Sequence, residues 1–345
     1  MTVILIALFW FTSRYPQLLH KAHVIGKVLP SMAWGSEVVH VSMSAPLWKR
    51  VLFGAINWLD GMKIGMSFGV LLGALLHTIL KYHPLKIGNN LTLNSLKGAL
   101  IGVPMGVCAN CAVPTACGVT RGNGRVEVAL GFLFSSPNFN PVVIMMTFSA
   151  LPLGMAVTKY VLLLGVILFI VPGLVKLLER KKPMKILTSF DAEDSCAIPM
   201  SQRCDEPFLK VFSSLMKEFG SNVWMLLKPT IKIMLIGSVV ASAMLVLLPW
   251  QSMLAHPNPL TMLFVSVLAV FMPTPIALDV MFAAQLHHQG VSNGYVMMFL
   301  MTLGTFSIIP SIYLWKEVSK PLAAILFGIF VIIGFVTGLV FGMWH

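Results

Sequence analysis

Residues 98–141, GALIGVPMGVCANCAVPTACGVTRGNGRVEVALGFLFSSPNFNP, decide the fold of this chain. The stretch is apolar but makes a poor helix, because glycine and proline interrupt it at Gly98, Gly102, Pro104, Gly106, Pro114 and Gly118. Glycine inside a helix costs about 1 kcal/mol relative to alanine, and proline about 3 kcal/mol. Irregular backbone at membrane depth is stable only where it is buried in protein or lines a cavity. The sequence therefore predicts a broken helix around a substrate site.

The composition places this broken stretch in a membrane. Hydrophobic residues make up 57% of the chain and charged residues only 10%, whereas soluble proteins carry about 25% charged residues. The net charge of +12 comes from basic residues in short loops between apolar segments. There they indicate topology, not a nucleic-acid partner. We therefore expect an all-α, multi-pass protein of the cell (inner) membrane, with the lipid bilayer as its main surroundings.

Apolar segments divide the chain into two halves. The first four segments cover residues 51–80, 94–120, 126–151 and 155–178, and the second four cover 222–249, 259–286, 294–315 and 321–344. Between them lies a polar stretch that we interpret as a cytoplasmic linker. The predicted boundaries are 50–178 for the first membrane repeat, 179–220 for the linker and 221–345 for the second repeat.

The first 49 residues form a separate N-terminal part. Residues 1–12 are apolar but short for a span, which needs about 20 residues, and they lack the features of a signal peptide. We expect a short or tilted first span there. Residues 14–48 are amphipathic, and we interpret them as an interfacial connection broken at Pro16, Pro30 and Pro46.

An offset of 169 residues relates the two halves. It places Lys63 on Lys232, Pro104 on Pro273, Pro141 on Pro310 and Gly165 on Gly334. Internal repeats around a site at the membrane midplane are a common plan of secondary transporters. The alternative is two similar apolar runs that match by chance.

The basic loops favour repeats of opposite orientation. If all eight segments span, four basic loop residues lie inside and six outside, against the usual bias. If the second segment of each half is a re-entrant hairpin, seven lie inside, and only Lys49, Arg50 and Lys159 lie outside. We therefore expect three spans and one hairpin per half. Eight ordinary kinked spans are the alternative.

Three of the five cysteines lie in the decisive stretch, at Cys108, Cys111 and Cys117. Soft sulfur ligands select soft, thiophilic species, so these three are candidate ligands for a soft metalloid. A structural zinc site would need a fourth ligand. Alternatively, each is a small buried hydrophobe. The five do not suggest a disulfide framework, and Cys196 and Cys204 in the linker either pass a soft metal to the pore or have no role.

Charged residues in the apolar segments are candidates for ion coupling. Asp279 follows Pro273 and Pro275 in the second half and matches Asn110 at the offset of 169. An ionisable residue within a membrane segment is a functional hypothesis by default, although Asp279 could instead cap a broken helix or pair with a lysine. Lys63 and Lys232 either attract an anion or extend to the interface.

A second broken element supplies small polar side chains. Half-helix ends expose backbone groups that bind ions or polar substrates, which makes this element a candidate part of the site; hydrogen bonds between helices are the alternative. The candidates are Ser136, Pro137, Asn138, Asn140 and Pro141.

These motifs carry a resemblance to a known family. The run Cys108-Ala-Asn-Cys111-Ala-Val-Pro114, then Gly122, then Phe134-Ser-Ser-Pro137-Asn-Phe-Asn140-Pro141 resembles the ArsP/YraQ-type predicted permeases over roughly residues 50–345. The resemblance implies a permease, and the characterised branch exports trivalent organoarsenicals. By motif it singles out Cys108, Cys111, Pro114, Pro137, Asn140 and Pro141.

The resulting hypothesis is a permease, not an enzyme, that exports a thiophilic solute, with trivalent arsenicals as the leading candidate. Cys108 and Cys111 capture the solute while Asp279 faces them and changes protonation. No cofactor is expected, and no nucleotide-binding GxxxxGK[ST] motif is present. The alternatives are a membrane thiol-disulfide oxidoreductase that uses Cys108 and Cys111, or a transporter of sulfur compounds or other anions. The sequence leaves the oligomeric state open.

Overall fold

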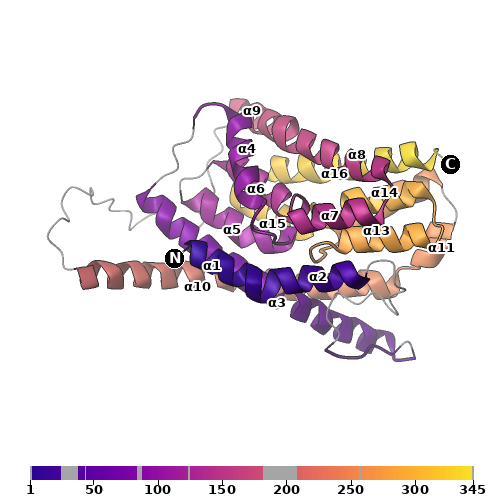
Figure 1. Cartoon of the computed structure of the whole chain (residues 1–345), viewed down its shortest axis with the longest axis horizontal. Coiled ribbons are helices and arrows are strands. Elements are labelled where there is room, and N and C mark those ends of the chain that lie inside the picture. The colour runs from indigo at the N-terminus through magenta and orange to yellow at the C-terminus, as the bar shows by residue number, and fades with distance from the viewer. Residues whose placement is uncertain are drawn as a thin grey trace.

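The computed structural model describes residues 2–24, 38–42, 44–83, 88–122, 125–181, 208–255 and 258–343. Helices make up all the regular secondary structure in these ranges. The all-α, multi-pass architecture expected from the sequence is thus confirmed. Figure 1 shows the long helices running roughly parallel, with the short helices of both halves between them.

The chain begins with one continuous helical stretch. It consists of α1 (Thr2–Phe9), a π-helical turn η1 (Trp10–Arg14) and α2 (Tyr15–Val24). The break expected at Pro16 was wrong. Pro16 is the second residue of α2, directly after the π-helical turn, and a local π adjustment lets a helix continue past a proline because the freed backbone groups find other partners. Pro30 lies outside the described residues, whereas Pro46 does precede a helix, α3.

The first half contains two long helical stretches and four short helices. The first long stretch is α3 (Leu47–Tyr82), and the last is α8 (Leu153–Gly165) continued by η2 (Val166–Ile170) and α9 (Val171–Lys181). Between them lie α4 (Leu91–Gly102), α5 (Ala109–Arg121), α6 (Val126–Asn138) and α7 (Pro141–Ala150).

The second half repeats this order. It runs through α10 (Phe208–Leu247), α11 (Trp250–Ala255), α12 (Pro259–Phe271), α13 (Leu278–His288), α14 (Asn293–Thr302), α15 (Ile308–Tyr313), η4 (Leu314–Val318) and α16 (Lys320–Gly342). The helix α10 begins at Phe208, inside the stretch 179–220 predicted as the linker, and the boundaries of the two repeats stay predictions. Cys196 and Cys204 lie outside the described residues. The common order agrees with the predicted repeat, whose inverted orientation stays a prediction.

Four helical stretches of the described chain are long and apolar enough to cross a membrane: Leu47–Tyr82, Leu153–Arg180, Phe212–Leu247 and Lys320–Gly342. The pair α6–α7 passes the same test but bends by 48°, and it makes a fifth if it counts as one span. The pairs α4–α5 and α12–α13, expected as re-entrant hairpins, are not among them, and their topology stays a prediction.

Each half is broken twice. Pro104 and Gly106 lie in a break, as predicted, but Gly98 and Gly102 lie within α4 and Pro114 and Gly118 within α5, so the interruptions expected at these four positions were wrong. The breaks are residues 103–108 before α5, 139–140 before α7, 272–277 before α13 and 303–307 before α15. Cys108 is the N-cap of α5 and Ala277 the N-cap of α13, which is the offset of 169 residues. Gly106, Ala277 and Gly304 adopt positive φ angles within the breaks.

Glycines let helices of the first half touch backbone to backbone. A Cβ atom added to Gly69 of α3 would lie 2.1 Å from the Cys111 carbonyl oxygen, and one on Gly73 would lie 2.3 Å from that of Pro114. On the facing helix, a Cβ on Gly118 would lie 2.0 Å from the Gly73 carbonyl oxygen. Small residues four apart are the usual device for close helix contact in membranes. This row fixes the cysteine-bearing helix α5 against α3.

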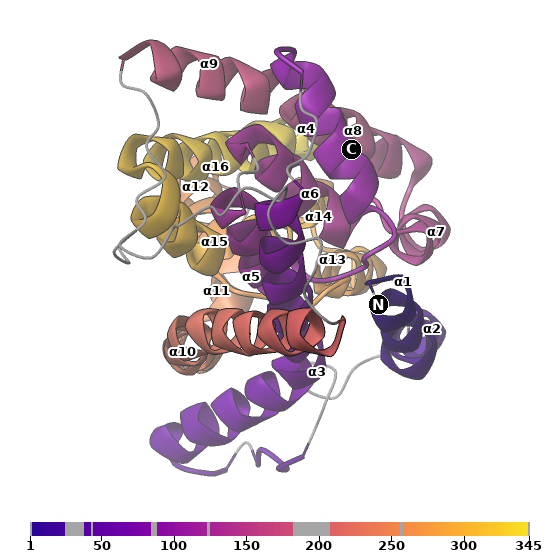
Figure 2. The same ribbon diagram turned by 90° about the vertical axis from the view of Figure 1, so that its left-hand side faces the viewer.

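The long helices enclose the broken ones. Figure 2 shows α3 and α10 at one side of the molecule and α9, α8 and α16 at the other, with α5, α6, α13 and α15 between them. The N-terminal stretch α1–α2 lies at the edge, near α7. The breaks therefore meet inside the protein, where irregular backbone is shielded from lipid.

Candidate functional site

Cys108 and Cys111 lie at the start of α5 and form a disulfide. Both are buried, and the Cys108 Sγ atom accepts a hydrogen bond from the Cys111 amide at 3.2 Å. Cysteine replaces the usual serine or asparagine at this N-cap because its sulfur can also accept from a free amide of the first turn. The leading hypothesis used the two cysteines as thiols, and the oxidoreductase alternative used them as a pair that forms a disulfide; the structure has the disulfide.

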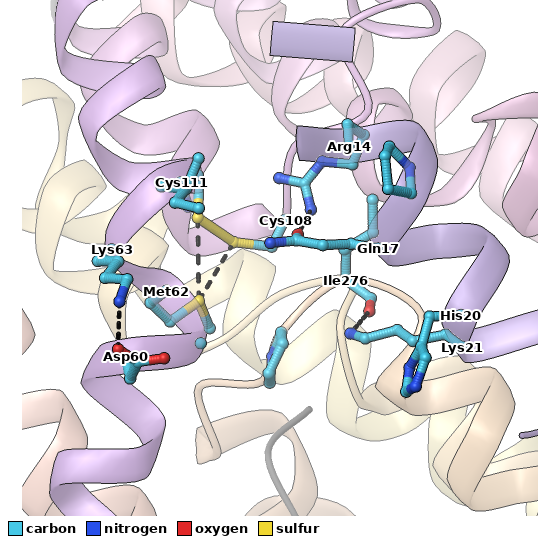
Figure 3. A pocket seen from close by; sticks show the side chains of 15 residues that line it. Arg14, Gln17, His20, Lys21, Asp60, Met62, Lys63, Cys108, Cys111 and Ile276 are labelled. Carbon is cyan, nitrogen blue, oxygen red and sulfur yellow. Dashed lines mark hydrogen bonds and ion pairs between the residues drawn. A yellow bond between two sulfur atoms is a disulfide. The ribbon is translucent and has the colours of Figure 1, made fainter. Parts of the chain in front are cut away.

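The pair faces a cavity of about 470 Å³. The walls come from four parts of the chain: the N-terminal helix, the middle of α3, the break before α5 and the break before α13. Figure 3 shows the disulfide on one side and the cationic side chains of the N-terminal helix on the other. The volume lies in the range of small-molecule sites, which are concave and carry few polar groups.

A third sulfur belongs to this site. The Met62 Sδ atom lies 3.7 Å from Cys108 Sγ and 3.9 Å from Cys111 Sγ, and Met62 also lines the cavity. Sequence reasoning missed it because 23 methionines are spread through the chain. The one signal in the sequence is that Met62 lies between Gly61 and Gly65, in the series of glycines four residues apart that continues along α3 through Gly69 and Gly73.

Cys117 does not join the expected sulfur site. It is buried and free, and it does not line the cavity. It lies six residues after Cys111 on the same helix, a rise of about 9 Å. The structure therefore brings Cys108 and Cys111 together but not Cys117, and Met62 supplies the third sulfur beside them. The described residues contain no cluster of three or more His, Cys, Asp or Glu side chains that could hold a metal ion.

Asp279 does not line the cavity; its ion-pair partner is Lys159. The exposed fraction is 0% for the Lys159 side chain and 4% for that of Asp279, so the pair is enclosed in the protein. The interpretation of Lys159 as a loop residue was wrong, since it lies within α8. The signal was available: a lysine inside an apolar segment is a functional candidate by the same rule that selected Asp279. The pairing alternative for Asp279 is the observed one.

Lys63 and Lys232 are placed differently. Lys63 lines the cavity and forms an ion pair with Asp60, three residues earlier on α3. Lys232 lies exposed on α10, away from the cavity. The equivalence suggested by the offset of 169 does not extend to their surroundings, because the N-terminal helix covers α3 at this position.

Side chains at the breaks bind one another across the two halves. The side-chain amide nitrogen of Asn110 donates to the Thr274 carbonyl oxygen at 3.1 Å, and the Ser307 hydroxyl donates to Asn110 Oδ1 at 2.6 Å. The Thr305 hydroxyl donates to Asn138 Oδ1 at 3.5 Å. These bonds join the breaks before α5, α13 and α15 to the end of α6. Asn110 and Asn138 thus hold the halves together at the centre.

The remaining predicted residues shape the backbone here. Ser136 accepts a hydrogen bond from the Val107 amide at 3.2 Å, and Asn140 caps α7 by accepting from the Val142 amide at 3.0 Å. The predicted prolines lie within a helix, at its first position or in the break before α13. Pro114 lies inside α5, Pro137 inside α6 and Pro141 at the first position of α7. The Pro273 carbonyl oxygen accepts a hydrogen bond from the Trp58 indole at 2.9 Å, and Pro275 lines the cavity.

The N-terminal helix contacts two breaks, which sequence reasoning missed. The Trp10 indole donates to the Pro104 carbonyl oxygen in the break before α5. The Lys21 ammonium donates to the Ile276 carbonyl oxygen in the break before α13, at 2.8 Å. Arg14, between them in sequence, lines the cavity. The segment expected to be an interfacial connection is thus part of the site.

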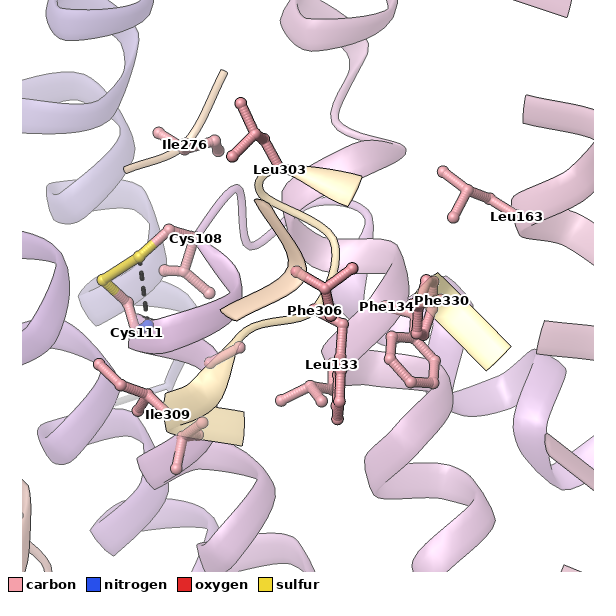
Figure 4. Close-up of a cluster of buried hydrophobic side chains, with 14 of the residues drawn as sticks. Cys108, Cys111, Leu133, Phe134, Leu163, Ile276, Leu303, Phe306, Ile309 and Phe330 are labelled. Carbon is pink, nitrogen blue, oxygen red and sulfur yellow. Dashed lines mark hydrogen bonds between the residues drawn. A yellow bond between two sulfur atoms is a disulfide. The ribbon is translucent and has the colours of Figure 1, made fainter. Parts of the chain in front are cut away.

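An apolar core supports the site from behind. Figure 4 shows the disulfide at the edge of this core, with Phe134, Phe306 and Phe330 further inside. The Phe306 and Phe330 rings stack with centroids 5.3 Å apart, and Phe134 lies 5.3 Å from Phe330. These rings join α6, the break before α15 and α16, so both halves contribute to one core.

Comparisons with known proteins agree with this arrangement. A family model described as a predicted permease matches residues 62–343. The UPF0718 protein YraQ of Escherichia coli strain K12 is 23% identical over 300 residues, which cover 86% of this chain and 79% of that protein. No solved structure matches the chain significantly. The matched range contains the four breaks, Met62 and both cavity cysteines, but not the N-terminal helix.

Proposed function

This chain belongs to the ArsP-type family of predicted permeases, and from that premise we propose that it exports a small thiophilic solute, such as a trivalent organoarsenical. It is a multi-pass membrane permease by family and by its apolar helices. The proposal concerns the finer points: the solute, the direction, and the route past Cys108 and Cys111.

One observation carries the proposal. Three sulfur atoms, from Met62, Cys108 and Cys111, gather in the wall of a cavity between the two broken segments. Soft sulfur ligands favour soft ions and metalloids over hard cations such as Mg²⁺. Sites at the junction of broken helices are the usual substrate sites of secondary transporters. The position and the ligand type thus support the same solute class.

Capture begins from the dithiol form of the site. Two molecules of a small thiol reduce the Cys108–Cys111 disulfide to two thiols and are joined to each other as a disulfide. A trivalent arsenical with two hydroxyl groups then forms one As–S bond to each cysteine. Each bond replaces an As–OH bond, and the thiol proton leaves with the hydroxide as water. Met62 adds a neutral sulfur contact beside the arsenic, and the disulfide form cannot bind in this way.

Asp279 and Lys159 are the proposed coupling pair. They join α13 of the second half to α8 of the first. Rocking of one half against the other is the common motion in transporters built from repeats, and it would separate the pair. A proton on Asp279 would neutralise its charge while Lys159 is apart, so protonation and motion are linked.

Transport of phenylarsine oxide into everted membrane vesicles tests the proposal. The double variant Cys108→Ser/Cys111→Ser is expected to lose transport, because oxygen binds trivalent arsenic more weakly than sulfur does. Cys117→Ser is the matched control, since Cys117 is on the same helix but outside the cavity. It should retain transport at equal expression. Unchanged transport by the double variant at wild-type expression contradicts the proposal.

The disulfide supports a second candidate, a membrane thiol-disulfide oxidoreductase. A CxxC pair at the start of a helix is the arrangement of known disulfide exchangers, and Cys108-Ala-Asn-Cys111 has it. Against this, the second half has Val280 at the position of Cys111, so an electron relay has no cysteine there. Trapping of free thiols before and after mixing with oxidised and reduced thiol partners discriminates. Turnover of the disulfide without solute movement favours the oxidoreductase.

A further inference from the structure

We propose that the solute bound at the Cys108–Cys111 cavity is an anion, held at its charged end by Arg14 and Lys21 and at its soft end by the sulfur atoms. This inference rests on the proposed function, because it names the charge class of the same solute. It follows from the cationic wall that the N-terminal helix adds to the cavity, a part of the chain outside the family match.

Arg14 is the first element of this wall. Its side chain belongs to a residue only 4% exposed, and its Nε atom has no hydrogen-bond partner. One terminal nitrogen donates to the Gln17 amide oxygen at 3.5 Å, and the guanidinium lies 4.9 Å from the centre of the Phe9 ring. No carboxylate pairs with Arg14 among the residues that the structure describes. A buried charge without a partner is costly, and an anion in the cavity would provide one.

The guanidinium and the sulfur atoms border the same space. A Cβ atom added to Gly65 would lie 3.0 Å from Arg14 Nη2 and 3.0 Å from Cys111 Sγ. Glycine therefore keeps open the gap in which these two groups approach each other. A small solute that contacts the sulfur would have its other end within reach of the guanidinium.

The surrounding charges leave the wall positive. Asp60 pairs with Lys63, and Asp279 pairs with Lys159, so the two carboxylates near the site are each matched. Lys21 lines the cavity but donates to the Ile276 carbonyl oxygen, which leaves its charge in place. Asp279 is near enough to interact with Lys21. The count is still four cations, Arg14, Lys21, Lys63 and Lys159, against the two carboxylates of Asp60 and Asp279, with His20 in addition. Two positive charges remain for a solute.

The chemistry of the two walls defines the solute class. One wall offers soft sulfur, and the other offers an arginine, which binds carboxylates and oxyanions through parallel hydrogen bonds. The match is a small anion with a soft centre at one end and charged oxygens at the other. A trivalent arylarsenical with a ring carboxylate is a suitable probe, because its arsenic accepts sulfur ligands and its carboxylate carries the charge.

Cysteine modification tests the positive wall directly. The reduced full-length protein, with Cys117, Cys196 and Cys204 changed to serine, is treated with methanethiosulfonates that carry a sulfonate, a trimethylammonium or no charge. The sulfonate should react far faster than the ammonium. Arg14→Gln and Lys21→Gln should each lower this ratio at least fivefold, which is the effect of a unit charge about 8 Å away even at the dielectric constant of water, about 80.

Two controls separate charge from structure. Arg14→Lys should keep the ratio, and so should Lys232→Gln, which removes an exposed lysine away from the cavity. The rate with the uncharged reagent should stay constant in every variant if the cavity is intact. An unchanged ratio in Arg14→Gln/Lys21→Gln, with the uncharged rate also unchanged, overturns the inference.

Protection against the uncharged reagent tests the solute class. 4-Carboxyphenylarsine oxide should slow the modification, and benzoate, with the same carboxylate but no arsenic, should slow it at least tenfold less. In Arg14→Gln/Lys21→Gln, protection by this arsenical anion should fall to that given by neutral phenylarsine oxide. Equal protection by the arsenical anion and benzoate, or protection by the arsenical anion that is the same with and without Arg14 and Lys21, overturns the assigned class. Because the vesicle test of Cys108 and Cys111 uses neutral phenylarsine oxide, its failure would refute the thiol route, whereas failure here alone would refute only the anion.

Discussion

Lys159 and Asp279 form an ion pair that joins the last helical stretch of the first half to the broken segment of the second. The two side chains are enclosed and lie 120 residues apart in sequence. A single charge at this depth would cost much free energy. The opposite charges of Lys159 and Asp279 offset that cost for each other. The pair therefore fixes α8 against α13 in the conformation described.

Removal of one partner should destabilise the protein more than removal of both. Lys159→Met or Asp279→Leu leaves an unpaired buried charge, which costs about 3–5 kcal/mol. The double variant replaces the pair with apolar side chains and should recover most of the thermal stability in detergent. If the pair couples transport to protons, the double variant will be stable but inactive in vesicles. Additive losses in the double variant would contradict the pairing.

The glycine contact between α3 and α5 predicts a contrast between two alanine substitutions. Gly69→Ala should lower the melting temperature strongly, because the added Cβ would lie 2.1 Å from the Cys111 carbonyl oxygen. Gly328→Ala on α16 meets nothing within 4 Å and should be neutral or stabilising by up to about 1 kcal/mol. Thermal unfolding of both variants in one detergent checks this. Equal effects would mean that α3 and α5 are not in close contact.

Met62 should affect affinity without affecting the fold. Met62→Leu keeps the side-chain volume, and such exchanges usually cost less than about 1.5 kcal/mol. Loss of the third sulfur should weaken binding of phenylarsine oxide to the reduced protein about tenfold, which corresponds to about 1.4 kcal/mol. Met66→Leu, one turn further along α3 and outside the cavity wall, is the control. Equal affinity of both variants would remove Met62 from the site.

Local rules were sufficient for much of the fold. The glycines and prolines around Pro104, Pro141 and Pro273 predicted where helices break, because the cost of these residues in a helix is a local property. Hydropathy predicted the long helices for the same reason. The start of α10 was not evident from hydropathy, because the helix extends beyond its apolar part through polar residues such as Lys217 and Glu218.

The candidate site was harder to predict, because it depends on contacts between distant segments. The position of Cys108 and Cys111 followed from their motif, but their neighbours did not. Met62 reaches them only because the glycine row lets α3 approach α5. Lys159 was assigned to a loop because it lies near the start of its apolar segment, and pairing with Asp279 is visible only in three dimensions. Arg14 and Lys21 enter the site because the N-terminal helix folds back over both breaks.

That helix is fastened at two points, by Trp10 to the break of one half and by Lys21 to the break of the other. A helix that is hydrogen-bonded to the breaks of both halves resists any movement that separates those breaks. If the halves exchange access by swinging apart, one of the two fastenings must release first. Any such movement therefore involves the segment before residue 62, which holds both hydrogen bonds and lies outside the family match.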